Sequence, residues 1–485
     1  MKLEEIITKI IHDKGKVYFI GIKGTGMCAL AELLHRAGAN VSGSDTDGVF
    51  YTNAILDSLH IPYFECFDSA HITDGNALII YSAAYTNKNP EVAEAARRGV
   101  PLVKYTDALG AYSALFDSSG IAGVHGKTTT TAITGTLLAA ARLPAQILAG
   151  SVVKDFGGRS TITIGNKYFV AETCEYRKHF LSFHPRRILL TSVESDHQDF
   201  FPSYESIRDA FVEYGERLEQ GGELIYCADN AGVCETVRLL QKKRGDITYT
   251  PYGFNADGFF KIKNYKNEDG ASAFEIDGIP RRWIVHVPGT HTVLNSTGAV
   301  ALVKSIALAE GVPFSGFLID KLSKALAAFS GSKRRSEVIG EAAGVLFMDD
   351  YAHHPTAVKT TLAGLREFYP GRRLVVSFMP HTYSRTAALL SDFAAAFEDA
   401  GVVFLHKIYA SAREEYGGAV TGLSLFEETR ARRGGVYYVD EPLDALNQLK
   451  SILRPGDIFI TLGAGDNWRL GESVFNEYKI KGAAL

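Results

Sequence analysis

Short hydrophobic runs rich in β-branched residues alternate with longer amphipathic stretches along most of the chain. The first run is KVYFI at residues 16–20, and the stretch after it repeats apolar residues on one face at helical spacing. Such alternation predicts strand–helix units, which assemble into parallel sheets with helices packed on their faces. The chain is therefore predicted to be an α/β protein.

The alternation restarts twice, at GIAGV (120–124) and at GVLFM (344–348). A chain of 485 residues is also too long for one ordinary hydrophobic core. We therefore expect three domains, with hinges near residues 112–119 and 330–337. The predicted domains cover residues 1–115, 116–332 and 333–485.

Three closely spaced runs interrupt the second set: FFKIKNYK (259–266), SAFEI (272–276) and RRWIVHVP (281–288). No helical stretch separates them, and strands joined by short turns pair in antiparallel fashion. We expect an antiparallel patch inserted into the second domain.

Composition narrows the class of protein. The chain is 46% hydrophobic and 22% charged, with a net charge of −4 and dispersed Lys and Arg, which argues against a disordered chain and a large nucleic-acid surface. The N-terminal segment MKLEEIITKIIHDKGK has charges inside every apolar run, and no other stretch is interpreted as a membrane span. We expect a cytoplasmic protein with no nucleic-acid and no membrane partner.

A glycine-rich turn follows the first predicted strand, with Gly21, Gly24 and Gly26 in the sequence GIKGTGM. Glycines let the backbone approach an anion there, and the N-terminus of the next helix supplies unpaired N–H groups and a positive potential. Ser44 and Asp45 end the second strand, where an acidic side chain commonly meets a ribose or a base. The spacing is not G-x-G-x-x-G, so nucleotide binding and a plain tight turn both stay open.

A second glycine turn, GVHGKTTT at residues 123–130, lies between the strand GIAGV and an apolar helix. Phosphate binding requires loop amides, a lysine for the β- and γ-phosphate oxygens, and a hydroxyl that binds Mg²⁺. Lys127 and Thr128 meet the last two requirements. The spacing departs from G-x-x-x-x-G-K-[ST], and the competing interpretation is a solvated lysine after a glycine turn.

Two candidate metal ligands follow later strands of the second set. Glu172 closes YFVAE, and His197 lies in VESDH after the strand RILLTSV. In an open α/β sheet the carboxyl ends of the strands face the ligand crevice, so both side chains could meet an ion beside the phosphates. Taken singly, each is equally consistent with a solvated loop.

The third set carries two polar loops, DDYAHHPT (349–356) and PHTYSRT (380–386), each directly after a strand. Histidine, tyrosine and arginine side chains on neighbouring strands suit an anionic, hydrogen-bonding substrate. A metal site, or one satisfied and one exposed imidazole, are the alternatives.

Taken in order, these motifs resemble those of the Mur ligases, which join amino acids or peptides to UDP-linked muramic acid. The resemblance runs from Gly21 to Asp466. It also includes VAE (170–172), VPGTH (287–291) with Asn295, Arg334, Arg335, Tyr409 and GAGD (463–466). Within the family, the chain is most similar to the members that add L-alanine to UDP-N-acetylmuramate.

The resemblance implies three domains: a Rossmann-like N-terminal domain that binds UDP, a P-loop-like central ATPase domain and a Rossmann-like C-terminal domain. It implies ATP and Mg²⁺ as cofactors and UDP-N-acetylmuramate and L-alanine as substrates. The implied reaction passes through an acyl phosphate and belongs to peptidoglycan precursor synthesis. The implied assembly is a monomer or a weak homodimer.

The resemblance also carries roles over to matching residues. ATP would contact Gly123, His125, Gly126, Lys127, Thr128, Thr129, His291, Asn295, Arg335 and Asp350. Mg²⁺ would bind Thr128, Glu172 and His197. The UDP-sugar and the amino acid would contact Gly21, Gly24, Thr25, Gly26, Ser44, Asp45, Tyr351, His381 and Arg385. The catalytic group would comprise Lys127, Glu172, His197, His353, His354 and Arg385, with the two adjacent histidines as candidate bases.

Several positions depart from the family pattern. The chain has E-T-C-E-Y-R from Glu172, with Cys174 in third place, where alanine-adding members often have E-A-D-E-S-D. Ser192 and Thr292 stand where Asn is common, and Thr382 stands where Arg is common. Glu172 and Glu175 are retained, so the metal role stands. The change at position 382 affects the expected contacts to the substrate carboxylate.

Three rival functions stay open at this point. A recycling ligase that attaches a whole tripeptide to UDP-N-acetylmuramate shares DDYAHHPT, although HTYSRT and GIKGTGM favour the alanine-adding branch. An NAD-dependent dehydrogenase would account for the first glycine turn but not for GVHGKTTT. A non-catalytic nucleotide-binding regulator is disfavoured by the joint presence of four candidate catalytic residues: Lys127, Glu172, His197 and Arg385.

Overall fold

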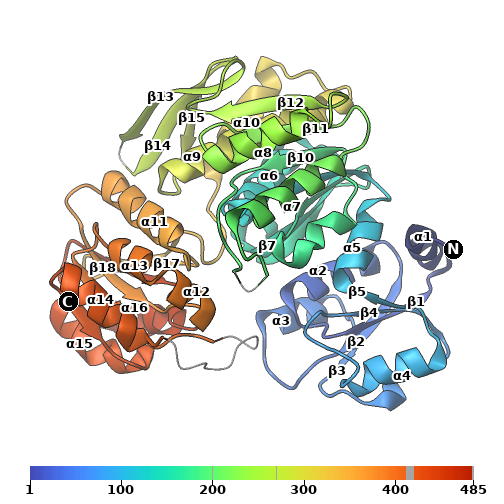
Figure 1. Cartoon of the computed structure of the whole chain (residues 1–485), viewed down its shortest axis with the longest axis horizontal. Helices are drawn as coiled ribbons and strands as arrows, with labels where there is room; N and C mark the ends of the chain where they lie inside the picture. The colour runs from blue at the N-terminus through green and yellow to red at the C-terminus, as the bar shows by residue number, and fades with distance from the viewer. Residues whose placement is uncertain (199, 269, 411–419, 483–485) are drawn as a thin grey trace. The chain divides into compact units, whose positions relative to one another are not determined.

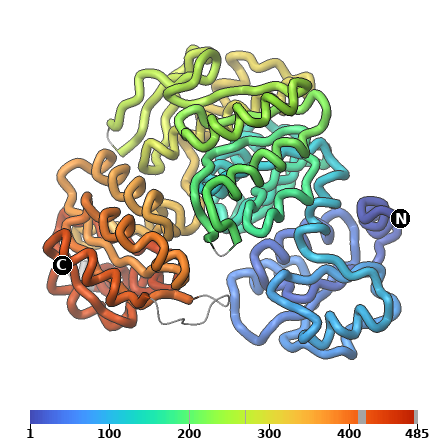
Figure 2. Tube along the Cα trace, in the orientation of Figure 1, coloured from blue at the N-terminus to red at the C-terminus, as the bar shows by residue number. Residues whose placement is uncertain are grey.

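A computed structural model describes residues 1–198, 200–268, 270–410 and 420–482, which form two compact units (Figures 1 and 2). The first unit comprises residues 1–193, 208–251 and 298–318. The second comprises residues 194–207, 252–297 and the described chain from residue 319. Each unit is built around sheets whose strands are mostly parallel, so the predicted α/β class is confirmed.

The first unit begins with a five-stranded parallel sheet in the order β3-β2-β1-β4-β5. Its strands are β1 (Lys16–Ile20), β2 (Asn40–Ser44), β3 (Tyr63–Phe64), β4 (Asn76–Tyr81) and β5 (Leu102–Lys104). Its helices are α1 (Leu3–Asp13), α2 (Thr25–Arg36), α3 (Tyr51–Ser58), α4 (Pro90–Arg98) and α5 (Tyr105–Ser113). The strand order reverses between β1 and β4, and ligands of open α/β sheets bind at such a switch point. The turn that follows β1 lies at this position.

The second sheet of the first unit has the strand order β12-β11-β10-β6-β9-β7-β8. Its strands are β6 (Asp117–Ala122), β7 (Ala145–Val153), β8 (Arg159–Thr163), β9 (Tyr168–Glu172), β10 (Arg187–Leu190), β11 (Glu223–Cys227) and β12 (Thr248–Gly253). Its helices include α6 (Lys127–Ala141), α7 (Tyr204–Glu216) and α8 (Ala231–Gln241). In the parallel register Ile121 pairs with Glu172, and Ala122 pairs with Leu190. The loops after β6, β9 and β10 therefore start at one edge of the sheet.

A buried carboxylate joins the two sheets of the first unit. Glu32 of α2 accepts hydrogen bonds from Arg159 Nη1 at 2.8 Å and from Thr161 Oγ1 at 2.7 Å, both on β8. Only 3% of the Glu32 side chain is exposed. Breaking a buried charge pair of this kind leaves an uncompensated charge, which is strongly destabilising, so this contact helps to hold the two sheets together.

The second unit contains the predicted antiparallel patch. It is formed by β13 (Phe260–Glu268), β14 (Ala271–Ile276) and β15 (Ile279–Val285), which pair in sequence order. Two helices follow it in the chain, α9 (Thr290–Ala309) and α10 (Gly316–Ala328).

The last sheet has the order β16-β17-β21-β18-β19-β20, with β16 antiparallel to its neighbour. Its strands are β16 (Glu337–Ala342), β17 (Val345–Asp350), β18 (Arg373–Phe378), β19 (Val402–Leu405), β20 (Val436–Tyr438) and β21 (Asp457–Leu462). Its helices are α11 (Pro355–Phe368), α12 (Tyr383–Ala388), α13 (Leu390–Ala395), α14 (Gly422–Arg432), α15 (Leu446–Ile452) and α16 (Trp468–Gly482). Alternate residues of β17 enter separate cores on the two faces of the sheet. Covering both faces explains why its strands are continuously apolar.

One helix has the length and composition of a membrane span. Helix α9 has 20 residues and a mean hydropathy of 1.4 in its most apolar window, so the expectation that no segment resembles a span is wrong on composition. However, 72% of that window is buried inside the protein. A core helix passes the same test, because an all-round apolar surface suits a protein interior as well as a membrane.

Candidate active site

The phosphate-binding loop predicted after β6 forms a tight turn into α6. Gly123 has φ +141° and Gly126 has φ +80°, values that L side chains rarely adopt. A Cβ atom on Gly123 would also lie 2.1 Å from Thr191 Oγ1 and 2.8 Å from the Ser192 nitrogen. The turn therefore requires glycine at position 123 for both conformation and space.

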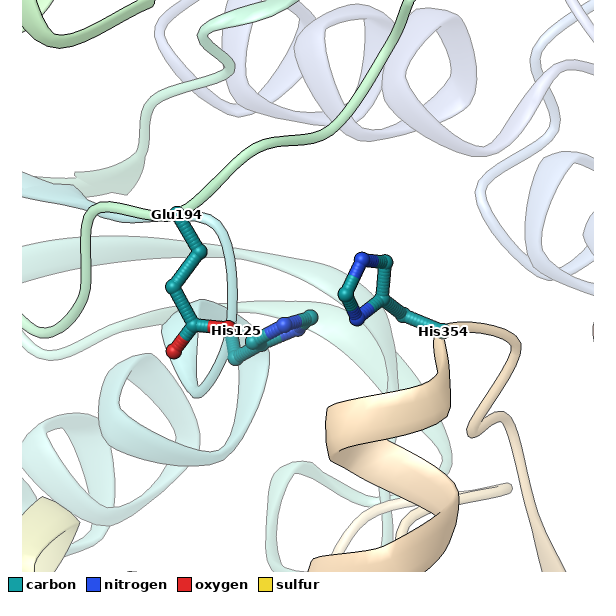
Figure 3. Close-up of side chains that lie close together, drawn as sticks. All are labelled: His125, Glu194 and His354. Carbon is teal, nitrogen blue, oxygen red and sulfur yellow. The ribbon is translucent and has the colours of Figure 1, made fainter. Parts of the chain in front are cut away.

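Two residues after β10 hold this loop in place. The amide of His125 donates to Ser192 Oγ at 2.7 Å, and Thr191 Oγ1 donates to the carbonyl of His125 at 2.5 Å. Figure 3 shows the His125 side chain on this loop. Ser192, which replaces the asparagine common in the family pattern, still supplies a hydrogen-bond acceptor to the loop.

Lys127, the first residue of α6, is held from two sides. Its Nζ donates to the carbonyl of Gly123 at 2.5 Å and to Glu175 Oε2 at 2.7 Å. Burial opposes the charged ammonium group, but the negative charges around it, chiefly that of Glu175, outweigh burial and raise the pKa of Lys127. The lysine is therefore cationic at neutral pH and oriented over the loop.

Thr128 and Glu172 form an oxygen-rich pair next to this lysine. Thr128 Oγ1 donates to Glu172 Oε2 at 2.8 Å, and the amide of Gly150 donates to the same carboxylate oxygen at 2.8 Å. A Cβ atom on Gly150 would lie 2.3 Å from that oxygen, so the close approach depends on glycine. A hydroxyl beside a carboxylate is the donor chemistry that Mg²⁺ prefers, so these residues fit the ion. Thr129 follows them, half-buried in the first turn of α6.

The turn after β1 places backbone groups at the N-terminus of α2. Gly21 has φ +89°, Gly24 is the N-cap residue, and Thr25 and Gly26 are partly exposed in the first turn of the helix. A Cβ atom on Gly21 would lie 2.6 Å from the ring of Tyr85. An exposed helix N-terminus at a switch point suits an anion such as a diphosphate.

Asp45 and Lys23 fix the shape of this turn. The Asp45 carboxylate accepts the amide of Lys23 at 2.7 Å, and the Lys23 side chain is completely buried. Its Nζ donates to the carbonyls of Thr46 and Gly48 at 2.8 and 3.0 Å. Lys23 thus links the loop after β1 to the loop after β2 by hydrogen bonds.

Ser44 is completely buried, and its hydroxyl donates to the buried carboxylate of Glu91. The same carboxylate accepts a hydrogen bond from Tyr18 at 3.0 Å and contacts His71 Nδ1 at 2.7 Å. The Ser44 hydroxyl therefore already donates its hydrogen bond within the protein. A contact between Ser44 and the substrate stays a prediction.

In the second unit Arg385 lies in a buried cluster of charged and aromatic side chains. Its Nη2 and Nε donate to Asp196 Oδ1 at 2.8 and 3.1 Å, and its Nη1 lies 3.0 Å from His381 Nδ1. Burial alone would raise the pKa of Asp196, but the charge of Arg385 holds it well below its usual range. The guanidinium is thus pre-positioned by a carboxylate of the protein itself.

His353 belongs to the same cluster. Its ring packs edge-on against Tyr351 and His381, with ring centroids 5.0 and 5.7 Å apart, and its Nδ1 lies 2.8 Å from the carbonyl of Tyr351. Burial, followed by the charge of Arg385, lowers the pKa of His353 well below its usual value. The imidazole is therefore neutral at neutral pH, and the carbonyl contact indicates that Nε2 is its basic nitrogen.

His354 has a structural position at the start of α11 (Figure 3). Its Nδ1 accepts the amide of Thr356 at 3.3 Å and caps the helix. Glu194, on the segment after β10, has a carboxylate oxygen within 4.8 Å of a ring nitrogen of His354.

Three further predicted residues lie near the carboxyl end of β17. Both oxygens of Asp350 are engaged, by the amides of Ser336 at 2.6 Å and Ala352 at 2.7 Å. The Arg335 guanidinium lies 5.0 Å from the ring centroid of Tyr351. Asp350, Arg335 and Tyr351 thus lie together at the carboxyl end of β17.

The remaining predicted residues lie elsewhere in the second unit. His291 and Asn295 are one turn apart on one side of α9, and Asn295 is 5% exposed. His197 has φ +54°, and its amide donates to Asp196 Oδ1 at 2.7 Å. His197 as a partner of Thr128 and Glu172 stays a prediction, because it belongs to the other unit.

Sequence reasoning missed two charged partners. Glu175 was interpreted together with Glu172 as support for the metal role and not as the residue that orients Lys127. Asp196 was given no role beside Arg385. Both had one signal in the sequence: each lies within three residues of a predicted ligand, Glu172 or His197, after a buried strand. The arrangement in the first unit can bind the phosphates of a nucleotide, and the cluster in the second can orient a carboxylate.

Three family models match the chain in order. The catalytic domain of the Mur ligase family matches residues 16–117, the Mur ligase middle domain matches residues 121–303, and the glutamate ligase domain of Mur ligases matches residues 334–465. The matches follow the three sets of strands and helices recognised in the sequence.

Solved structures share this fold. A UDP-N-acetylmuramate–alanine ligase from Thermotoga maritima has a TM-score of 0.76 at 23% identity, and a murein peptide ligase from Psychrobacter arcticus has 0.67 at 21%. Each match covers 96% of this chain and 99% of that one. A MurF ligase from Thermotoga maritima, solved in complex with ADP, has a TM-score of 0.59 at 15% identity, covering 92% of this chain and 95% of that one.

A curated relative extends the match to the sequence itself. The UDP-N-acetylmuramate–L-alanine ligase of Treponema pallidum (strain Nichols) is 50% identical over 465 residues, which cover 96% of this chain and 97% of that protein. With three family domains in order and half of all aligned residues identical, this chain belongs to the Mur ligase family.

Proposed function

We propose that this chain joins L-alanine to the lactyl carboxylate of UDP-N-acetylmuramate, using ATP, in peptidoglycan precursor synthesis. The observation that carries the proposal is the grouping of Lys127, Thr128 and Glu172 around a glycine turn, in a chain half-identical to an alanine-adding ligase. This grouping suits transfer of the γ-phosphoryl group of ATP.

The reaction follows from the chemistry of amide synthesis. A carboxylate is a poor electrophile, so its oxygen first attacks the γ-phosphorus of ATP. The bond from that phosphorus to the bridging oxygen breaks, which gives ADP and an acyl phosphate. The amine of L-alanine then attacks the acyl carbon and loses a proton. The carbon–oxygen bond breaks last, and inorganic phosphate leaves with an oxygen of the original carboxylate.

Lys127 would stabilise the charge that develops on the transferring phosphoryl oxygens. Two of its hydrogen bonds go to Gly123 and Glu175, which leaves one N–H group for a phosphate oxygen. Thr128 and Glu172, together with His197, would hold Mg²⁺, which when bound would neutralise phosphate charge. Gly123, His125, Gly126 and Thr129 would supply or shape the loop.

The UDP part of the acceptor substrate and the nucleoside of ATP would bind at two separate sites. The diphosphate of UDP-N-acetylmuramate would bind at Gly21, Gly24, Thr25 and Gly26, with Asp45 near the uridine. The ATP nucleoside would contact His291, Asn295, Arg335 and Asp350. An exposed helix N-terminus in the first site supports the first assignment.

Arg385 would orient the carboxylate of L-alanine, with His381 and Tyr351 beside it. The ion pair with Asp196 supports this assignment, because it fixes the guanidinium plane before substrate arrives. His353 would accept the proton of the amine through Nε2, because its Nδ1 already contacts the carbonyl of Tyr351. His354, engaged as a helix cap, is the less suited of the two candidate bases.

The proposal also includes domain boundaries at residues 115 and 332. It further includes a cytoplasmic location and an assembly that is a monomer or a weak homodimer. A cytoplasmic location is supported by the dependence on ATP and by the burial of the one span-like helix among the described residues.

The test is phosphate release with UDP-N-acetylmuramate, ATP and Mg²⁺, scanned across amino acids and the recycling tripeptide. We expect release with L-alanine and none with the Lys127→Ala variant, because a lost preorganised electrostatic contact costs on the order of 10²-fold or more. Release with tripeptide alone would support the recycling ligase. Hydride transfer to or from NAD without phosphate release would support a dehydrogenase.

A further inference from the structure

Tyr105, the first residue of α5, lies against the N-terminus of α2. A Cβ atom on Gly26 would lie 2.6 Å from Tyr105 Oη and 2.7 Å from its Cζ, so the phenol end of the ring rests on Gly26. Gly26 is in the first turn of α2, where the diphosphate is proposed to bind. Glycine at position 26 is therefore what allows the Tyr105 hydroxyl to reach this helix end.

The same phenol lies in the electrostatic field of the metal-binding carboxylate. Burial, and after it the negative charge of Glu172, raises the pKa of Tyr105 above its usual value. The phenol is consequently neutral and able to donate a hydrogen bond at physiological pH. Tyr105 thus contacts the first turn of α2, and Glu172 belongs to the same compact unit.

The Tyr105 hydroxyl has no hydrogen-bond partner within the described ranges of the chain, and the side chain is partly exposed. A buried tyrosine hydroxyl normally finds a partner. A partly exposed hydroxyl beside two binding elements is instead available to a ligand.

The substrate has one part that must cross this region. Its diphosphate would bind at the α2 N-terminus, and its lactyl carboxylate must reach the γ-phosphate beside Thr128 and Glu172. The muramic acid sugar connects these two ends covalently. We propose that Tyr105 is a specificity-determining residue that hydrogen bonds to this sugar, an inference that rests on the proposed function.

The contact has the chemistry of sugar recognition. The N-acetyl carbonyl and the ring oxygens of the hexosamine are acceptors for a phenol donor, and the aromatic ring offers an apolar face to the C–H groups of a sugar. A substrate without the sugar, such as UDP, keeps the diphosphate contacts and loses this one. Tyr105 therefore distinguishes UDP-N-acetylmuramate from UDP.

The experiment measures binding of UDP-N-acetylmuramate and of UDP by calorimetry to the full-length protein and its Tyr105→Phe variant. Loss of one neutral hydrogen bond should weaken UDP-N-acetylmuramate binding about threefold to tenfold. The UDP affinity should be unchanged, and the KM for UDP-N-acetylmuramate should rise by a similar factor while the KM for ATP stays constant.

Tyr112→Phe is the matched control, since it removes a hydroxyl from the same helix. Tyr112 donates to Gln146 Oε1 at 2.7 Å inside the core, so its loss should lower stability without changing either affinity. A second variant, Gly26→Ala, should displace the phenol and weaken UDP-N-acetylmuramate binding more than Tyr105→Phe, because the new methyl group also lies in the diphosphate turn.

Wild-type affinity in Tyr105→Phe would overturn the proposal, and so would an equal loss for UDP and UDP-N-acetylmuramate, which would place the phenol on the diphosphate. Failure of the proposed function appears elsewhere, in the wild-type protein itself. A wild type that releases no phosphate with L-alanine and binds no UDP-N-acetylmuramate would overturn both. Intact wild-type ligation with an unaffected Tyr105→Phe variant would overturn the Tyr105 contact alone.

Discussion

The ammonium group of Lys127 illustrates how neighbouring charges prepare a residue for its chemistry. A lysine buried alone tends to lose its proton, because low dielectric surroundings disfavour the charged form. Here Glu175 reverses that tendency and raises the pKa of Lys127. The carboxylate is itself buried, with 2% of its side chain exposed, so the two charges depend on each other.

Glu175→Gln should therefore make activity sensitive to alkaline pH. The raised pKa keeps Lys127 protonated as pH rises, and removal of the Glu175 charge lowers that pKa. The variant should lose kcat/KM for ATP at a lower pH than the wild type does, which a pH profile of phosphate release will measure. Glu213→Gln, which alters the exposed pair with Lys178, is the control and should leave the profile unchanged. Superimposable profiles for Glu175→Gln and wild type would contradict this account.

Arg385→Lys should affect the amino-acid step selectively. Lysine keeps the charge but cannot reproduce the fork that contacts Asp196 and a substrate carboxylate together. We expect the KM for L-alanine to rise about tenfold or more, with a much smaller change in the KM for ATP. Arg373→Lys is the control. It alters the ion pair between Arg373 and Asp457 in the last sheet and should change neither KM. A fall in kcat with the alanine KM unaltered would instead indicate a contact between Arg385 and the phosphate groups.

At the scale of elements, the sequence predicted those strands, turns and helices that are determined by short, contiguous stretches of residues. A β-branched run, a glycine turn and an apolar helix in succession predicted β6, the turn from Gly123 to Gly126 and α6. The predicted strand covered residues 120–124, whereas β6 covers Asp117–Ala122. The edge strands β8 and β16 were not predicted, because polar edge strands lack the continuous apolar run that marks a central strand.

Contacts that depend on strand register could not be predicted. The pairing of Ile121 with Glu172 brings that carboxylate to the phosphate loop, and long-range pairing brings Arg385 to Asp196 across 189 residues of sequence. The partner of the Ser44 hydroxyl could not be predicted either, because Glu91 lies 47 residues away in the sequence. A substrate contact from Ser44 stays a prediction.

Gly123→Ala should damage the phosphate loop beyond the cost of its backbone conformation. The added methyl group would overlap Thr191 Oγ1 and the Ser192 backbone. We expect a loss of about 1–3 kcal/mol in the free energy of unfolding and clearly weaker ADP binding, measured by denaturant unfolding and calorimetry.

Gly157→Ala is the control for the cost of placing an alanine at a positive φ. Gly157 has φ +70°, and a Cβ atom there would meet nothing within 4 Å. It should cost about 1 kcal/mol and leave ADP affinity intact. Equal ADP affinities in the two variants would show that the loop tolerates a side chain at position 123.

At the scale of the whole molecule, residues that the sequence grouped into three domains belong to two compact units. The sheets of the first two predicted domains share a unit, in which Glu32 contacts both Arg159 and Thr161. The segment that carries Asp196 and His197 belongs to the second unit with Arg385.

Glu172→Ala and His197→Ala should each raise the Mg²⁺ concentration needed for the half-maximal rate. If the two residues share one ion, removing the second ligand after the first should have a smaller effect than removing it alone. Metal titrations of both single variants and the double variant will measure this coupling. Strictly additive effects, with unchanged Mg²⁺ dependence, would separate His197 from the metal site.

The most direct test of the central claim follows an oxygen atom through the reaction. UDP-N-acetylmuramate labelled with ¹⁸O in its lactyl carboxylate is incubated with the protein, ATP, Mg²⁺ and L-alanine, and products are analysed by mass spectrometry. Carboxylate activation by ATP predicts that the released phosphate carries one ¹⁸O and that the alanyl product retains the other. Unlabelled phosphate, or phosphate release without an alanyl product, would contradict the assignment of this chain as an alanine-adding ligase.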